Sequence, residues 1–167
     1  EFRRVLFRSS SETDSEVIVH LVDFYYAKGG SLLEALRASV KRLEGAYAIG
    51  VIARDDPDHI VAARMGSPLV VGKGLGENFI ASDPLALRPV TDRFIFLEEG
   101  DLVQISRDDI LIWNIDDESV IRASVKVVLG EDEVSRGNYR HYMQKEIHQQ
   151  PQVLQATLEG RIGRTRV

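Results

Sequence analysis

Apolar residues recur at helical spacing in the stretch from residue 13 to residue 28. The apolar positions fall on one helical face: Val17, Ile18, Leu21, Val22 and Tyr25. Thr13, with Glu16 three residues later, matches the capping-box pattern of a helix start. The glycine pair at 29 and 30 favours a helix end. The pattern therefore predicts a helix over residues 13–28 that is capped by Thr13.

A second helix is predicted to start at Ser31, because Glu34 again follows at capping-box spacing. Its buried stripe is predicted to consist of Leu33, Leu36, Val40 and Leu43, and Gly45 is predicted to end it. Two short capped helices joined by glycines indicate a helical layer that packs on a flat partner.

The chain from residue 46 onward supplies such a partner in the form of short β-compatible runs separated by polar turns. The predicted strands cover residues 46–53, 60–64, 69–71, 78–81, 93–97, 101–106, 110–114 and 120–128. The cluster at residues 54–58 is predicted to be a turn. Helices followed by strands at hairpin spacing predict an α+β fold built in layers.

The character of the chain changes after residue 129. Residues 130–138 are polar and are predicted to form a linker. Residues 140–149 show a helical pattern, and Pro151 suits the first position of another helix. The apolar face of this last helix is predicted to consist of Leu154, Leu158 and Ile162. The segment is short, so it is predicted to be the opening of a second domain.

Composition narrows the possible functions. The chain has 167 residues, a formal net charge of −5, 44% apolar residues and no cysteine. The acidic balance predicts that neither nucleic acid nor an anionic membrane is a partner. No apolar run approaches the roughly 20 residues that a membrane span requires. The lack of cysteine excludes disulfides, thiolate metal sites and a thiol nucleophile within this chain, and it fits a cytoplasmic location.

Few side chains stand out as candidates for chemistry. His141 and His148 are seven residues apart, but no third ligand follows at metal spacing, so no metal site is predicted. The glycine-rich run at residues 72–76 lacks the pattern of a nucleotide-binding loop and is predicted to be a turn between strands. Ser82 lacks the context of a hydrolase nucleophile. Residues 82–84 are instead interpreted as a turn, in which Ser82 or Asp83 caps a short helix that begins at Pro84. No cofactor is predicted.

Asp14 is the first candidate for a binding residue. It lies just inside a predicted helix start, where backbone N–H groups and the helix dipole favour negative charge. Judged by its position alone, Asp14 only helps to cap the helix.

Residues 1–10 differ from the rest of the chain, with three arginines and no acid after Glu1. An Arg- and Ser-rich transit peptide is one interpretation, but such a peptide begins with Met, whereas this segment begins with Glu-Phe. We favour a cloning or assembly scar and exclude these residues from the fold prediction.

Three motifs together resemble a known family. They are Ser11-Glu-Thr-Asp-Ser-Glu-Val-Ile18, Gly76-Glu-Asn-Phe-Ile-Ala-Ser-Asp-Pro-Leu-Ala-Leu87 and Tyr139-Arg-His-Tyr-Met-Gln-Lys-Glu-Ile147. Their order and spacing resemble those of the glutamine–fructose-6-phosphate aminotransferases (isomerizing), also called glucosamine-6-phosphate synthases. The resemblance covers residues 11 to about 161. The third motif is specific to this family among enzymes that share a glutaminase domain.

The resemblance implies an N-terminal-nucleophile hydrolase fold, a layered αββα sandwich truncated at its N-terminal side. Residues 11–129 would be part of a type 2 glutamine amidotransferase domain, and residues 139–167 the start of a sugar-phosphate isomerase domain after the 130–138 linker. The implied full-length enzyme makes glucosamine 6-phosphate and glutamate from fructose 6-phosphate and glutamine, the entry step to amino-sugar nucleotide synthesis. It is expected to be a homo-oligomer through its isomerase domain.

The resemblance also changes the interpretation of Asp14. In the related glutaminases the aspartate of this motif binds the α-amino group of glutamine, which a fixed carboxylate suits. The family's nucleophile is an N-terminal cysteine whose own amine serves as base, and this chain contains no cysteine. The chain is therefore expected to be an inactive internal fragment with no catalytic residue of its own. The alternative is a non-catalytic module, derived from a glutaminase, that binds an amino acid or a regulatory partner.

Overall fold

The structure is a computed structural model, and it describes residues 11–127 and 136–158. The chain divides into two compact units with the boundary between Val127 and Val128, and each unit is described by itself. Most of the predicted linker and Ile162 lie outside the described residues. None of the helices in the described parts is both long and apolar enough to cross a bilayer.

The first unit begins with helices α2 (Asp14–Tyr26) and α3 (Leu32–Val40), which pack against each other. The capping box that begins α3 is confirmed. The Glu34 N–H donates to Ser31 Oγ at 3.2 Å, and the Ser31 N–H donates to Glu34 Oε2 at 2.9 Å. This exchange satisfies two backbone donors that an open helix start leaves unpaired.

The capping box predicted for α2 is wrong. Thr13 occupies the N-cap position, but its side chain makes no capping hydrogen bond. Glu16 instead accepts a hydrogen bond from the Ser11 N–H at 2.6 Å, and its other oxygen lies 3.3 Å from His20 Nε2. The reason is local competition, because Ser11 reaches the carboxylate that would otherwise turn back to the cap residue.

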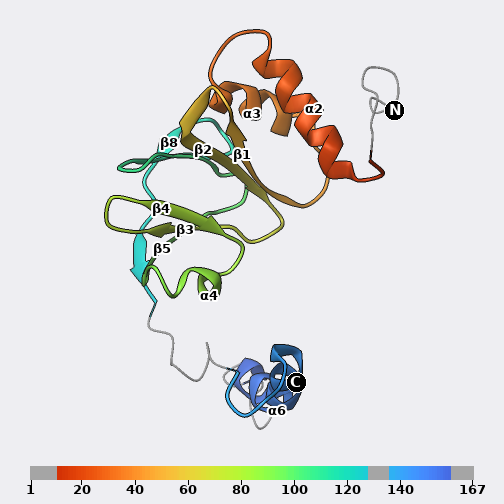
Figure 1. The fold of residues 1–167 in the computed structure, drawn as a ribbon, viewed down its shortest axis with the longest axis vertical. Coiled ribbons are helices and arrows are strands. Elements are labelled where there is room, and N and C mark those ends of the chain that lie inside the picture. Colours follow the sequence, from red (N-terminus) through yellow and green to blue (C-terminus); the bar gives the residue numbers. More distant parts are fainter. Residues whose placement is uncertain (1–10, 128–135, 159–167) are drawn as a thin grey trace, which may run out of the picture. The chain divides into compact units, whose positions relative to one another are not determined.

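Two antiparallel sheets follow the helices (Figure 1). The five-stranded sheet has the order β1 (Tyr47–Ala53), β2 (Asp56–Met65), β6 (Leu102–Ile105), β7 (Ile110–Trp113), β8 (Ser119–Val120). The four-stranded sheet has the order β4 (Asn78–Ala81), β3 (Val70–Lys73), β5 (Arg93–Phe96), β9 (Ser124–Lys126). Every named strand pair is antiparallel.

Alternation along β2 divides the core into two layers. Val61 and Ala63 join α2 and α3 in one buried cluster, while Ala62, between them, joins a second cluster with residues of both sheets. Successive strand residues point to opposite faces, so β2 contributes to both clusters. The first unit therefore stacks a helix layer on one sheet and that sheet on the other. The short helix α4 (Pro84–Leu87) lies against β3, since a Cβ added at Gly72 would meet Leu87 at 2.9 Å. The predicted α+β architecture is confirmed.

Two details of the predicted strands are wrong. The expected strand at 120–128 is split, because β8 pairs with β7 in one sheet while β9 pairs with β5 in the other. The expected turn at 54–58 is shorter, because β2 already begins at Asp56, which pairs with Ala53. Pro57 is tolerated in β2 because pairing with β6 begins only at Ile60, so no ladder bond is lost there.

Polar contacts join the segments that cross between the sheets. Arg122, after β8, donates to both carboxylate oxygens of Asp101, at 3.0 and 2.8 Å, and Asp101 is fully buried. Asp101 also accepts from the Glu98 N–H at 2.7 Å, after β5. Arg64, near the end of β2, donates to the backbone oxygens of Ser67 and Leu97. The Asp101 carboxylate raises the pKa of Arg122 above its ordinary value, although burial opposes this.

The second unit is dominated by a single helix, α6 (Tyr142–Leu158). Pro151 lies inside it, so the prediction of two helices with Pro151 at the start of the second is wrong. Proline removes one backbone donor but its fixed φ is helical, so the hydrogen bonds on either side can continue the helix.

The two cap positions give a matched test of this description. Ser31→Ala removes a hydroxyl that accepts a capping bond, so we expect a loss of about 1 kcal/mol in the free energy of unfolding. Thr13→Ala removes a hydroxyl that makes no capping bond and is expected to change it by less than about 0.3 kcal/mol. Urea denaturation of both variants measures the difference. Equal losses would show that Thr13 caps α2 after all.

Candidate functional site

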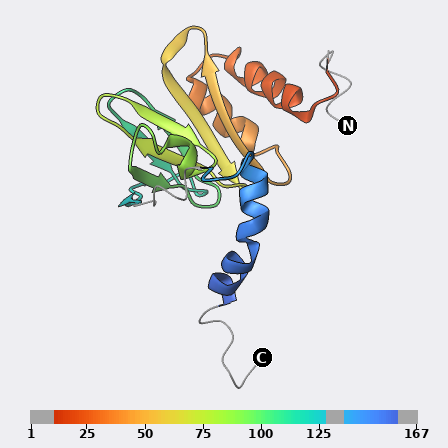
Figure 2. The same cartoon turned by 60° about the horizontal axis from the view of Figure 1, so that its bottom comes forward.

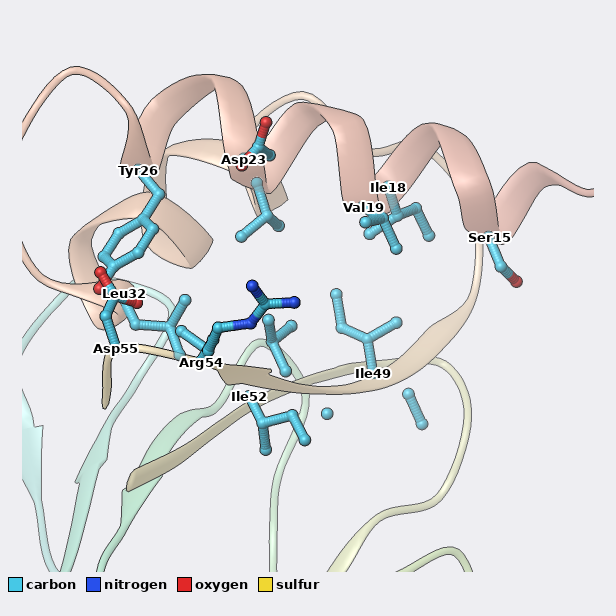
Figure 3. A pocket seen from close by; sticks show the side chains of 15 residues that line it. Ser15, Ile18, Val19, Asp23, Tyr26, Leu32, Ile49, Ile52, Arg54 and Asp55 are labelled. Carbon is cyan, nitrogen blue, oxygen red and sulfur yellow. The ribbon is translucent and has the colours of Figure 1, made fainter. Parts of the chain in front are cut away.

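A groove runs between α2 and β1 (Figure 3). Its volume is about 840 Å³. It is lined by Ser15, Ile18, Val19, Val22, Asp23, Tyr26, Leu32 and the continuous run of residues 48–55. The groove has the size of a small-molecule site, but one wall is a single strand along nearly its whole length.

The groove forms because helix α2 lies beyond β1, which is the edge strand of the five-stranded sheet. Strand β1 is the first in its sheet, and among the described strands it pairs with β2, while Tyr47 also forms an isolated bridge with Gly66. Helix α3 packs over β1 and β2, and α2 packs on α3. In both views of the fold α2 lies on the side of β1 away from β2 (Figures 1 and 2). The free edge of β1 therefore faces space that α2 covers on one side.

The walls of the groove are largely apolar. Along β1, Ile49 and Val51 are half-buried toward the helices, while Gly50 and Ile52 lie on the opposite, exposed face. Val19 on α2 is 65% exposed and Ile52 is 75% exposed. Two large, exposed aliphatic side chains in one groove form an exposed apolar patch.

Polar groups gather at the end of the groove where β1 finishes. Arg54 extends into the space that faces α2, and the Tyr26 ring points toward Asp55 (Figure 3). Burial raises the pKa of Tyr26, and the hydrogen bond to the Asp55 carboxylate raises it further. Tyr26 is therefore a hydrogen-bond donor at neutral pH, while Arg54 carries the positive charge inside this end of the groove.

Asp14 is the first residue of α2, directly before Ser15, which lines the other end of the groove. The backbone at Asp14 thus lies at the mouth of the groove. The Asp14 side chain lies outside the part of the chain that the structure describes, so its role in binding stays a prediction.

The remaining candidate residues have structural partners. Asp83 caps α4, accepting from the Leu85 N–H at 2.7 Å, so the interpretation of this site as a turn and cap is confirmed. The predicted turn at 72–76 is also confirmed, with the Gly74 N–H donating to the Glu77 carbonyl at 2.9 Å between β3 and β4. His148 Nδ1 lies 2.8 Å from the Gln144 carbonyl oxygen within α6. Across the described residues, no group of three potential metal ligands comes together.

The groove was not predicted from the sequence. A signal was present in residues 46–53, which are apolar or small throughout instead of alternating with charged residues. An edge strand that faces water usually carries charge or proline, whereas a continuous apolar run is typical of a strand with neighbours on all sides.

Comparison with known proteins identifies relatives of the whole described chain. No family model matches it. The glutamine–fructose-6-phosphate aminotransferase (isomerizing) of Pseudomonas aeruginosa is 54% identical over 158 residues, which is 95% of this chain and 26% of that relative. The enzyme of the same name in Escherichia coli is 50% identical over 157 residues, 94% of this chain and 26% of that relative. This chain is a homologue of these aminotransferases.

The Pseudomonas putida enzyme of the same name is also 54% identical, over 95% of this chain. The resemblance inferred from the three sequence motifs is thereby confirmed. The chain spans about a quarter of the length of the curated aminotransferases it matches.

The polar end of the groove makes a testable prediction about Tyr26. Because its pKa is raised in the folded chain, Tyr26 should ionise above its ordinary value near 10. The stability that neutral Tyr26 contributes is complete below that pH and is lost as the pH rises through the folded-state pKa. Asp55→Asn should lower the Tyr26 pKa while leaving it raised by burial, which is the larger cause.

Tyrosinate absorbance during alkaline titration measures these values, with Tyr26→Phe assigning the signal. Asp58→Asn is the matched control, because Asp58 is exposed and is not a cause of the shift. An unchanged Tyr26 pKa in Asp55→Asn would show that the hydrogen bond does not form.

Proposed function

We propose that this chain is part of an aminotransferase that moves the amide nitrogen of glutamine to fructose 6-phosphate. The products are glutamate and glucosamine 6-phosphate. The observation that carries the proposal is an identity of 50–54% over about 95% of the chain with enzymes named for this reaction. A cytoplasmic location and a homo-oligomeric full-length enzyme belong to the same proposal.

The domain assignment is part of the proposal. Residues 11–129 belong to the type 2 glutamine amidotransferase domain, and residues 139–167 begin the sugar-phosphate isomerase domain. The first would have the N-terminal-nucleophile hydrolase fold. Two features support this fold: the two stacked antiparallel sheets and the helix layer on one of them. The short helix α4, which lies against the four-stranded sheet, corresponds to the helical layer on that side.

In this proposal Asp14 binds the α-amino group of glutamine. The first turn of α2 provides backbone N–H groups and the positive end of a helix dipole, which keep a carboxylate ionised. An ionised carboxylate and an ammonium group form a charge-assisted hydrogen bond. The position beside Ser15 supports this role, because Ser15 already lines the groove.

The chain is proposed to bind but not to hydrolyse glutamine. Hydrolysis by this family's route requires a thiolate nucleophile, and the chain has no cysteine. Among the other candidates, Ser82 directly precedes the residue that caps α4 and has no activating base in the described contacts.

Glutamate release therefore tests the chain by itself. We expect the 167-residue chain to release glutamate from glutamine no faster than buffer, while the full-length Escherichia coli relative serves as positive control. Turnover that rises in proportion to the chain concentration and survives repurification would contradict the proposal.

A chimeric enzyme tests the proposed function directly. Residues 11–158 replace the matching segment of the Escherichia coli aminotransferase, and formation of glucosamine 6-phosphate is measured. We expect activity within about tenfold of the native enzyme, since homologous segments at this identity keep the same packing. A folded chimera without product would instead favour the non-catalytic amino-acid-binding module.

Asp14→Asn in this chimera tests the role of the side chain. Loss of the charge-assisted bond should raise the KM for glutamine at least about tenfold, because such bonds contribute about 1.5–3 kcal/mol. The KM for fructose 6-phosphate should not change. Glu12→Gln is the matched control, as Glu12 is exposed and lies two residues away. Equal effects of the two substitutions would rule out a specific role for Asp14.

A further inference from the structure

A loop closed by hydrogen bonds surrounds the start of helix α2. Glu16 lies in the first turn of the helix, and its Oε2 accepts from the Ser11 N–H at 2.6 Å and from the Ser11 hydroxyl at 2.5 Å. The single proton of that hydroxyl is used there, so the Thr13 hydroxyl, which lies 2.9 Å from Ser11 Oγ, donates to Ser11. These contacts join the two ends of the segment 11–16, and Asp14 lies inside the loop that they close.

The second oxygen of Glu16 is also engaged. Glu16 Oε1 lies 3.3 Å from His20 Nε2, one helical turn further along α2. The Glu16 side chain is only 18% exposed, which is low for a glutamate. A carboxylate that is held from two sides cannot change rotamer without losing charge-assisted hydrogen bonds. Glu16 is therefore a fixed point at the start of the helix.

This loop controls how the chain enters the helix. Thr13 has an extended backbone, with φ −84° and ψ 146°, whereas the helix begins at Asp14. The Thr13 side chain makes no capping hydrogen bond, and a helix end without a cap is prone to fraying. The bonds from Ser11 to Glu16 thus take the place of the missing cap and hold position 14 in the helix.

Glu16 is not placed to bind the substrate itself. The described residues that line the groove include Ser15, which lies at one end of it in Figure 3, but neither Glu16 nor His20. Residues two apart on a helix do not face each other, so positions 14 and 16 lie on different sides of α2. Any influence of Glu16 on a ligand bound at position 14 must therefore pass through the backbone of the loop.

We propose that Glu16 is a positioning residue for Asp14. By holding Ser11, Glu16 fixes the backbone at Asp14 and with it the position from which the Asp14 carboxylate meets the α-amino group of glutamine. A binding group has to be held within about 0.5 Å of its productive position, and a carboxylate on a fraying helix end does not meet this limit. This role depends on the proposed function, because it requires Asp14 to bind glutamine.

The test uses the chimeric enzyme and two inhibitors that differ by one group. Glutamate carries the α-amino group, and glutarate is the same molecule without it. The ratio of the glutarate inhibition constant to the glutamate inhibition constant, measured against glutamine, therefore reports the contribution of the amino group. We expect Glu16→Ala to lower this ratio at least about fivefold, because a displaced carboxylate binds the amino group poorly. The constant for glutarate and the KM for fructose 6-phosphate should not change.

A structural role alone gives a different result. A general distortion of the site weakens both inhibitors equally and leaves their ratio as it was. A ratio that is unchanged in Glu16→Ala would overturn the proposal.

Two further variants separate the loop contacts from the charge. Glu16→Gln keeps an oxygen that can accept from Ser11, so it should restore most of the ratio. Glu12→Ala is the matched control, because Glu12 is an exposed carboxylate in the same segment, and it should leave the ratio unchanged. A similar loss in Glu12→Ala would show that the negative charge of the segment matters and would overturn the positioning role.

Ser11 and Glu16 should act as one unit. Ser11→Ala removes the hydroxyl bond and keeps the backbone bond, so it should lower the ratio less than Glu16→Ala does. Adding Ser11→Ala to Glu16→Ala should lower the ratio no further, whereas additive losses would overturn the proposal. Ser11 is exposed, so this variant keeps the test available if Glu16→Ala does not fold.

Asp14→Asn in the same assay separates this role from the proposed function. It should lower the ratio at least as much as Glu16→Ala does. If Asp14→Asn lowers the ratio and Glu16→Ala does not, Asp14 binds glutamine without Glu16, and only the positioning role is wrong. If neither lowers it, the proposed role of Asp14 is wrong as well. If Glu16→Ala alone lowers it, Glu16 contacts the amino group itself, which also overturns the positioning role.

Discussion

The pair formed by the buried Asp101 and the half-buried Arg122 links the segments in which the chain changes sheets. Asp101 precedes β6 and Arg122 follows β8, so their two hydrogen bonds join one crossing segment to another. Arg64 links the third crossing segment, which follows β2, by donating to the backbone oxygens of Ser67 and Leu97. A fully buried carboxylate is costly unless its oxygens are satisfied, and here Arg122 and the Glu98 N–H satisfy both. The sheets are stacked as they are because these crossings are fixed.

This arrangement determines where the molecule is open. With β2 and β6 held at the crossings, the helices pack over β2 and leave β1 as the last strand. The four-stranded sheet packs closely against β1, because a Cβ added at Gly50 would lie 2.7 Å from Ile80 Cδ1. The groove beside β1 is thus bounded by a helix that the core holds in place, and its shape does not depend on a flexible loop.

Sequence patterns correctly predicted the elements that depend only on neighbouring residues. The box at Ser31 and the cap at Asp83 needed only neighbouring residues, and both are confirmed. The strand predicted at 120–128 failed because its division depends on Arg122 reaching a carboxylate 21 residues away. The groove could not be found by periodicity, since it depends on which strand lies at the end of the sheet. The role of Asp14 came from family resemblance and not from its position.

The contacts at the crossings also bear on how the chain folds. Arg64 meets Leu97 across 33 residues of sequence, and Asp101 meets Arg122 across 21. Loop closure over such separations has an entropic cost before any contact repays it. These contacts require strands of both sheets to be in position, whereas α3 and the β3–β4 hairpin require only local contacts. We therefore expect the helix and the hairpin to form before the two sheets join.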